Sequence, residues 1–172
     1  TEIPESTFAF CEKLTSVAIP DSVTSIGKEA FKNCTSLTAI DLPDAVTFID
    51  ASAFLDCQSL TQLQLPSALE ALGSQAFGGC IGLTSLTVPD GVRKLPSWVF
   101  SGCQSLASLT LPTDLTSIGT GAFHGCRSLT EITIPDSVQS IGEMAFANMA
   151  RLQTIHVGAG NSAYQTVDGV LL

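Results

Sequence analysis

The amino-acid sequence predicts an α/β repeat solenoid, with a parallel β-sheet on one face and short helical turns and extended segments on the other. Within each unit, apolar residues alternate with polar ones over the length of one strand, as they do when one side of a strand is buried. A strict period of 20 to 50 residues is typical of coils that bury their apolar faces only against neighbouring coils. Here the period is 23 residues, marked by Phe8, Phe31, Phe54, Phe77, Phe100, Phe123 and Phe146.

Three further residue types keep the same interval. Each fixes one position of the coil, so the sequence predicts a single domain of about seven 23-residue coils over residues 1–157. These residues are Cys11, Cys34, Cys57, Cys80, Cys103 and Cys126; Leu14, Leu37, Leu60, Leu83, Leu106, Leu129 and Leu152; and Pro20, Pro43, Pro66, Pro89, Pro112 and Pro135.

One coil illustrates the elements in order. Residues 37–43, "LTAIDLP", alternate as a strand buried on one side, and Pro43 ends this strand because it lacks an N–H. Val46 and Ile49 carry the apolar pattern through a second, shorter extended piece. The segment "ASAFLDC" then places Ala and Phe inward with the spacing of one helical turn. The expected coil is therefore strand, turn, extended piece and helical turn.

Composition excludes several functions. The net charge is −9, from 16 acidic and 7 basic residues, and the basic residues are scattered along the chain. Nucleic acids and anionic membrane surfaces are held by clustered Lys and Arg, so neither is an expected partner. The apolar stretches are only a few residues long, which excludes insertion into a membrane.

The six cysteines allow three interpretations. Three disulfides would suit a secreted protein, but equivalent positions of a solenoid point their Cβ atoms the same way, whereas a disulfide needs them to face each other. A zinc site needs four converging ligands, which a straight row of thiols cannot supply. We therefore expect free, reduced and buried thiols that face backbone in a tight turn.

The repeat unit, as in "LTEITIPDSVQSIGEMAFANM", resembles the BspA-like, or Treponema-type, leucine-rich repeat family over about residues 3–157. The combination of Pro, Ala-Phe and Cys at fixed spacing is specific to that pattern. The resemblance implies a right-handed leucine-rich-repeat superhelix. It also implies secreted or cell-surface proteins of host-associated bacteria and some protists, which act in adhesion and protein binding rather than in catalysis.

The last segment, residues 158–172, breaks the period. It contains "NSAYQTVDGVLL", in which Asp168-Gly169 lies between two valines, the short-range pattern of a β-hairpin turn. Similar segments interrupt repeat arrays in the family that the chain resembles, which implies that further repeats follow.

A binding function must use what the repeats leave exposed. Each expected strand shows two outward side chains, which together form a polar ridge suited to a protein partner. The candidate residues of this sheet face are Ala39, Asp41, Gln62, Gln64, Ser85, Thr87, Ser108, Thr110, Glu131 and Thr133.

A second candidate lies in the most divergent coil, "GVRKLPSWVF". A column is the set of residues that hold the same position in successive coils. Trp98 occupies a column whose residue type varies from coil to coil and which we expect on the convex side. There it could act with Arg93 and Lys94 as an anchor for a partner. It could equally fold over Pro96 and fill a local gap.

An acidic column follows the prolines at Asp21, Asp44, Asp90 and Asp136. Ser67 takes the equivalent place in one coil, so we expect these side chains to bond turn N–H groups and to form a negative edge rather than a calcium site.

No catalytic constellation is present, because His124 and His156 fall in different columns without a converging nucleophile or carboxylate. We therefore predict no enzyme, no cofactor and no metal site. The favoured function is an extracellular or cell-surface adhesion module that binds a protein, such as a host extracellular-matrix protein, or a glycan. The alternative is a structural spacer or stalk of a larger surface protein. The sequence leaves the oligomeric state open.

Overall fold

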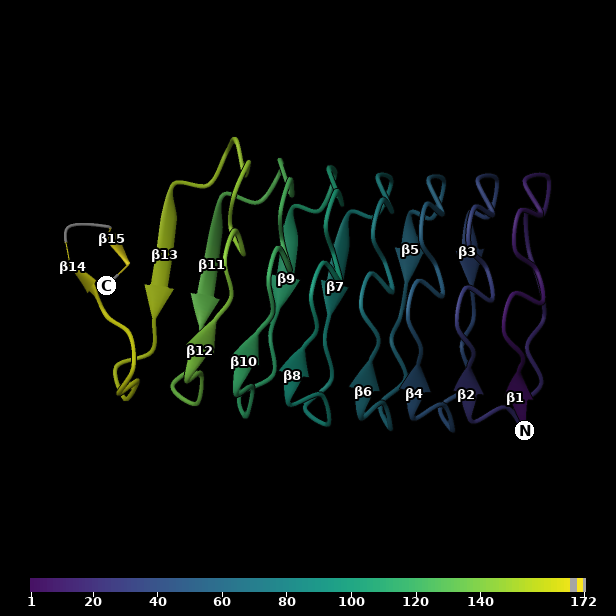
Figure 1. The fold of residues 1–172 in the computed structure, drawn as a ribbon, viewed down its shortest axis with the longest axis horizontal. Coiled ribbons are helices and arrows are strands. Elements are labelled where there is room, and N and C mark those ends of the chain that lie inside the picture. Colours follow the sequence, from purple (N-terminus) through teal and green to yellow (C-terminus); the bar gives the residue numbers. More distant parts are fainter. Residues whose placement is uncertain (168–169, 172) are drawn as a thin grey trace.

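In the computed structural model, which describes residues 1–167 and 170–171, the chain winds into coils that lie side by side along one axis (Figure 1). Neighbouring coils pair through short parallel strands that form two stacks. Stack A contains β3 (Ala39–Ile40), β5 (Gln62–Leu63), β7 (Ser85–Thr87), β9 (Ser108–Thr110), β11 (Glu131–Ile134) and β13 (Thr154–Val157). Stack B contains β1 (Glu2–Ile3), β2 (Ser25–Ile26), β4 (Phe48–Ile49), β6 (Ala71–Leu72), β8 (Lys94–Leu95), β10 (Ser117–Ile118) and β12 (Ser140–Ile141).

The register of both stacks follows the sequence period. Ser25 pairs with Phe48 in stack B, and Ser85 pairs with Ser108 in stack A, each 23 residues on. The strand expected at residues 37–43 contains β3, while the second extended piece forms stack B, which is itself a parallel sheet. The parallel solenoid of stacked coils is therefore confirmed.

The repeated phenylalanines fill the core. Their rings form one continuous stack from Phe8 to Phe146, with centroids 5.0 to 6.0 Å apart and planes within 16° of parallel. The five inner rings, from Phe31 to Phe123, are fully buried. Because each of the five inner rings stacks on the rings of two other coils, the stack joins the coils to one another as well as filling each coil.

The cysteines form a second buried row. From Cys34 to Cys126, each thiol donates a hydrogen bond to the phenylalanine carbonyl of the preceding coil, as Cys57 does to Phe31 at 3.1 Å and Cys103 does to Phe77 at 3.2 Å. Cys34 to Cys126 are free and fully buried, which confirms the expected row of reduced thiols at five positions. The prediction is wrong for Cys11, which is exposed.

The predicted helical turns are wrong: the described residues contain no helix, and so none that is long and apolar enough to cross a membrane. Consecutive tight turns replace them. The N–H groups of Glu29 and Phe31 donate to carbonyls of the next coil, those of Ala51 and Ala53. The N–H group between them, that of Ala30, instead donates to the carbonyl three residues back, that of Gly27. This alternation leaves no run of bonds to the fourth residue back, which a helix requires.

These turns place two residues of every coil in the left-handed backbone region. One column has φ between 55° and 61°, and it includes Glu29, Trp98 and Gly121. A second column, four residues further along, includes Asn33 and Asp56, with φ of 58° and 59°. An apolar spacing of three residues suits such turns as well as a helix, so the sequence pattern alone does not separate the two.

Stack B is interrupted at one place among the described strands. Glycines 27, 73, 119 and 142 follow the strands and donate their N–H to the preceding coil, as Gly73 does to Ile49 at 2.7 Å. Asp50 does the same to Ile26 at 2.9 Å. Pro96 occupies this column without an N–H, and β6 and β8 are the neighbours that do not pair.

Stack A is divided into strand pairs. β3 pairs with β5, β7 with β9 and β11 with β13, whereas β5 does not pair with β7 and β9 does not pair with β11. A single bridge between Ala18 and Asp41 continues the stack toward the first coil.

The last described segment covers the end of stack B. The Tyr164 hydroxyl accepts the Ile141 N–H at 2.9 Å, and the Asn161 amide donates to the carbonyls of Pro135 and Val138. β14 (Thr166–Val167) then pairs antiparallel with β15 (Val170–Leu171), as a hairpin requires. The residues expected to form its turn, Asp168 and Gly169, lie outside the described residues.

Candidate binding surface

The sheet-face candidates lie where the sequence pattern predicts outward side chains. All ten, from Ala39 to Thr133, are exposed, and they alternate with the buried residues of stack A, as Ser85 and Thr87 do around Leu86. Paired strands place them side by side, Ser108 beside Ser85 and Thr110 beside Thr87. The structure thus brings them together as one continuous polar surface.

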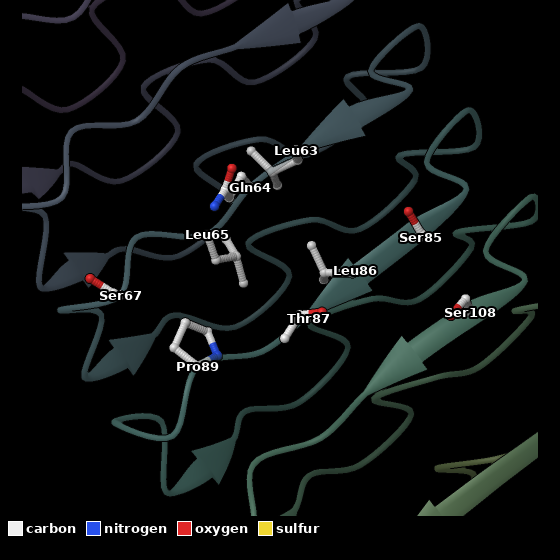
Figure 2. A pocket seen from close by; sticks show the side chains of 9 residues that line it. All are labelled: Leu63, Gln64, Leu65, Ser67, Ser85, Leu86, Thr87, Pro89 and Ser108. Carbon is white, nitrogen blue, oxygen red and sulfur yellow. The ribbon is translucent and has the colours of Figure 1, made fainter.

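This surface is hollowed at three places, two of which lie where neighbouring strands do not pair. The middle hollow, of about 490 Å³, lies between β5 and β7 and reaches β9 (Figure 2). Its rim carries Gln64 and Thr87, while Leu65 and Leu86, which are 6% and 4% exposed, supply apolar side chains below. The hollow therefore combines hydrogen-bonding groups with apolar contact area.

Two more hollows lie on the same surface. The N-terminal hollow, of about 390 Å³, is lined by residues 40–44 together with flanking residues of the coils before and after. The C-terminal hollow, of about 460 Å³, lies between β9 and β11. Sequence reasoning missed all three, because the alternating pattern predicts which side chains face outward but not the shape of the surface between neighbouring coils.

The N-terminal hollow is acidic. Asp21, Asp41 and Asp44 line it and are exposed. The expectation that the post-proline aspartates bond turn N–H groups is wrong, because a main-chain bond closes the turn, as from Val46 to Pro43 at 3.0 Å. Within the described residues, Asp136 is the one member of that column whose carboxylate accepts a hydrogen bond, from Gly160 at 3.1 Å.

Trp98 lies against the next coil. Its indole occupies the space that a side chain at Gly121 would need, and its ring meets His124 edge-on with centroids 5.5 Å apart. The side chain is half-buried rather than freely exposed as the variable column suggested. Trp98 therefore fills the space beside Gly121 in the next coil, rather than folding over Pro96 in its own coil.

Replacement of Trp98 by alanine is therefore expected to lower the free energy of unfolding, by about 1–3 kcal/mol, because contacts with Gly121 and His124 are lost. Urea denaturation measures this change. Met144→Ala is the matched control, since Met144 holds the same column with 52% exposure and should change stability by less than about 0.5 kcal/mol. An unchanged stability for Trp98→Ala, together with weaker binding to a partner, would identify an anchor instead.

Arg93 and Lys94 belong to a different surface. Both line a hollow of about 520 Å³ at the break between β6 and β8, together with Pro96. Arg93 also lies 3.6 Å from the Asp114 carboxylate, in an exposed ion pair. The lining of this hollow does not include Trp98, so the structure does not unite the three residues in one site.

The two histidines each have a local partner. His124 lies 2.8 Å from the Asn148 amide, and His156 lies 3.4 Å from the Glu131 carboxylate across β13 and β11. In the part of the chain that the structure describes, no group of three or more His, Cys, Asp or Glu side chains could hold a metal ion.

Fold and surface together define a parallel solenoid of 23-residue coils with an open polar face, which is the architecture of a repeat scaffold. The family model of the BspA type leucine rich repeat region matches the chain in 6 copies, over residues 1–100 and 47–166. The chain belongs to this family. Comparison with curated proteins gives no significant match.

Solved structures agree. A leucine rich cell surface protein from Faecalibacterium prausnitzii A2-165 is 38% identical with a TM-score of 0.91, over 99% of this chain and 46% of that one. A leucine rich repeat protein of T. pallidum is 32% identical with a TM-score of 0.58, over 75% and 71% of the two chains. The pneumococcal vaccine antigen PcpA, 19% identical over 92% and 54% with a TM-score of 0.57, shares the fold. The chain thus spans about half the length of the first of these proteins.

Proposed function

We propose that this chain is a non-enzymatic binding module of an extracellular or cell-surface protein, and that the exposed face of stack A recognises a host or extracellular-matrix protein. One observation carries the proposal: ten outward side chains of stack A form a continuous surface with three hollows over a buried core. Membership of the BspA type leucine rich repeat family and the similarity to a leucine rich cell surface protein support it.

The surface suits binding for physical reasons. Stacking of seven phenylalanines and backbone pairing between coils hold the outward side chains in fixed positions, so little conformational entropy is lost when a partner docks. Gln64, Thr87 and Thr110 supply hydrogen-bond donors and acceptors next to apolar hollows.

A triple variant, Gln64→Arg, Thr87→Arg and Thr110→Arg, tests the proposal. Three long charged side chains would cover the middle of the surface, so binding to extracellular-matrix proteins or host glycans in an array is expected to weaken at least about 30-fold. Each of these side chains is exposed, so the fold should persist, which circular dichroism checks.

The matched control places the same charge on stack B, as Ala71→Arg, Gln139→Arg and Ser140→Arg at exposed positions. This variant should bind as the unchanged chain does. If the stack B variant loses binding instead, recognition lies on the other stack. If the folded chain binds nothing in the array, the structural spacer function is favoured and the proposal fails.

A further inference from the structure

Both stacks are interrupted at the same place, between the coil of residues 60–82 and the coil of residues 83–105, which we call the central junction. β5 and β6 belong to the first coil, and they do not pair with β7 and β8 of the second. Where β9 and β11 separate, by contrast, stack B stays paired through β10 and β12. Among the described strands, the central junction is the one place between successive coils that lacks pairing on both stacks.

A hollow lies on each stack at this junction. The middle hollow, of about 490 Å³, lies on stack A between β5 and β7 (Figure 2). The hollow of about 520 Å³ that Arg93 and Lys94 line lies on stack B between β6 and β8. Residues of both coils line each hollow, so its width depends on the angle between the two coils.

The contacts that still join the two coils are concentrated in the tight turns. The N–H of Phe77 donates to the Val99 carbonyl at 2.9 Å, and the Cys103 thiol donates to the Phe77 carbonyl at 3.2 Å. On the stack A side, the Thr84 hydroxyl lies 3.5 Å from the Thr61 carbonyl, which is long for a hydrogen bond. Two paired bodies that are joined firmly along one edge can rotate about that edge, as domains do about a hinge.

The residue at position 96 accounts for the break on stack B. In its column, Gly73 and Gly119 donate their N–H groups to the strand of the preceding coil, at 2.7 and 2.8 Å. The corresponding acceptor for Pro96 is the Leu72 carbonyl, but proline has no N–H to donate. Asp50 makes the same bond as the glycines at 2.9 Å, so a Cβ in this column is compatible with pairing. The missing donor therefore explains why β6 and β8 do not pair.

We propose that the central junction is a hinge of the solenoid, and that Pro96 keeps it open on stack B. Rotation about the turn contacts changes the angle between two halves that each keep their own paired strands, and it changes the width of the middle hollow with that angle. The hinge goes beyond the proposed function and does not depend on it. Where a partner docks on stack A, the hinge adjusts the middle of the surface to the partner's shape.

Spin labels on stack A test the inference. Cys11→Ser removes the exposed thiol, so that labels attach to introduced, exposed cysteines while the buried row stays unreacted. Ala39→Cys with Ser108→Cys spans the hinge. Ser85→Cys with Thr154→Cys lies in the same column, also three periods apart, but on one side of the hinge. Double electron–electron resonance gives the distribution of distances between the labels of each pair.

The pair that spans the hinge should give a distribution at least about 1.5 times as broad as that of the other pair, because only the first crosses a junction without strand pairing on either stack. Equal widths would overturn the inference. A chain that is rigid by this measure and still binds a matrix protein through Gln64, Thr87 and Thr110 would leave the proposed function intact.

Pro96→Gly tests the origin of the hinge. It supplies the missing N–H, so β6 and β8 should pair and the distribution of the spanning pair should narrow by at least about a third. Pro112→Gly is the matched control: it makes the same change next to β9, which is already paired with β7, and it should leave the width unchanged. A Pro96→Gly chain that folds, as checked by circular dichroism, but keeps the broad distribution would overturn the role of Pro96.

Discussion

Replacement of Phe77 by alanine is expected to lower the free energy of unfolding by about 3–5 kcal/mol, the usual loss for a fully buried phenylalanine. Phe77 stacks between Phe54 and Phe100, with centroids 5.4 and 5.8 Å away, so the cavity would open in the middle of the ring stack. For a chain of this size the midpoint of thermal unfolding should fall by about 10 °C.

Because Phe77 lies in the middle of the ring stack, its replacement should also reduce the cooperativity of unfolding. Each coil contacts mainly its neighbours, so a defect at Phe77 weakens the connection between the two halves of the array. Urea denaturation is therefore expected to become less cooperative, with a smaller slope than in the unchanged chain. Calorimetry and urea titration followed by circular dichroism measure both effects.

Two other phenylalanines serve as controls. Phe146, at the end of the ring stack, is only partly buried, and its replacement by alanine should cost less than the replacement of Phe77 without reducing cooperativity. Phe10 is 61% exposed, so Phe10→Ala should change stability by less than about 0.5 kcal/mol. Equal losses for Phe77→Ala and Phe146→Ala would contradict a stack that joins the coils.

The period made most of the core predictable. Strictly repeated Phe, Cys and Leu positions indicate columns of side chains that meet their copies in the next coil, and the structure shows the phenylalanine rings stacked in this way. The outward residues of stack A were predictable for a related reason. Alternation along a strand determines which side chains are exposed, as at Ser85 and Thr87.

The turn type, the exposure of Cys11 and the hollows could not be predicted from the sequence. The Ala-Phe-x-x-Cys spacing suits both a helical turn and consecutive tight turns, and the hydrogen bonds between coils, such as Phe31 to Ala53, decide between them. Cys11 and Cys34 have the same local sequence pattern, yet Cys34 is buried and Cys11 is exposed, a difference that the local pattern does not predict. The middle and C-terminal hollows lie where strands separate, and of the strand breaks only the one at Pro96, through its missing N–H, has a signal in the sequence.

The thiol row is expected to make the protein sensitive to alkali. Burial raises the pKa of Cys34 to about 11 and the pKa values of Cys57 and Cys126 to about 12, from an ordinary value of 9.0. The pKa values of Cys80 and Cys103 are also raised well above 9.0 by burial.

The direction in which stability changes with pH follows from proton linkage. Above pH 9 the thiols ionise in the unfolded chain but stay protonated in the folded chain, so the folded chain binds more protons and its stability falls as pH rises. The stabilisation is complete below pH 9 and is lost progressively toward pH 11 to 12. Each such thiol lowers the stability by about 1.4 kcal/mol per pH unit, so the five buried thiols together lower it by roughly 7 kcal/mol per pH unit.

Urea denaturation under reducing conditions between pH 8 and 11 measures this slope, and thiolate absorbance reports when the thiols ionise. Cys57→Ser keeps a donor for the Phe31 carbonyl but removes one ionisable thiol, so its slope should be shallower by about 1.4 kcal/mol per pH unit. Cys11→Ser, at the exposed cysteine, should keep the steeper slope of the unchanged chain. Because ionisation should require unfolding, thiolate absorbance from the buried row that appears near pH 9 in the folded chain would contradict the closed packing of these thiols against the phenylalanine carbonyls.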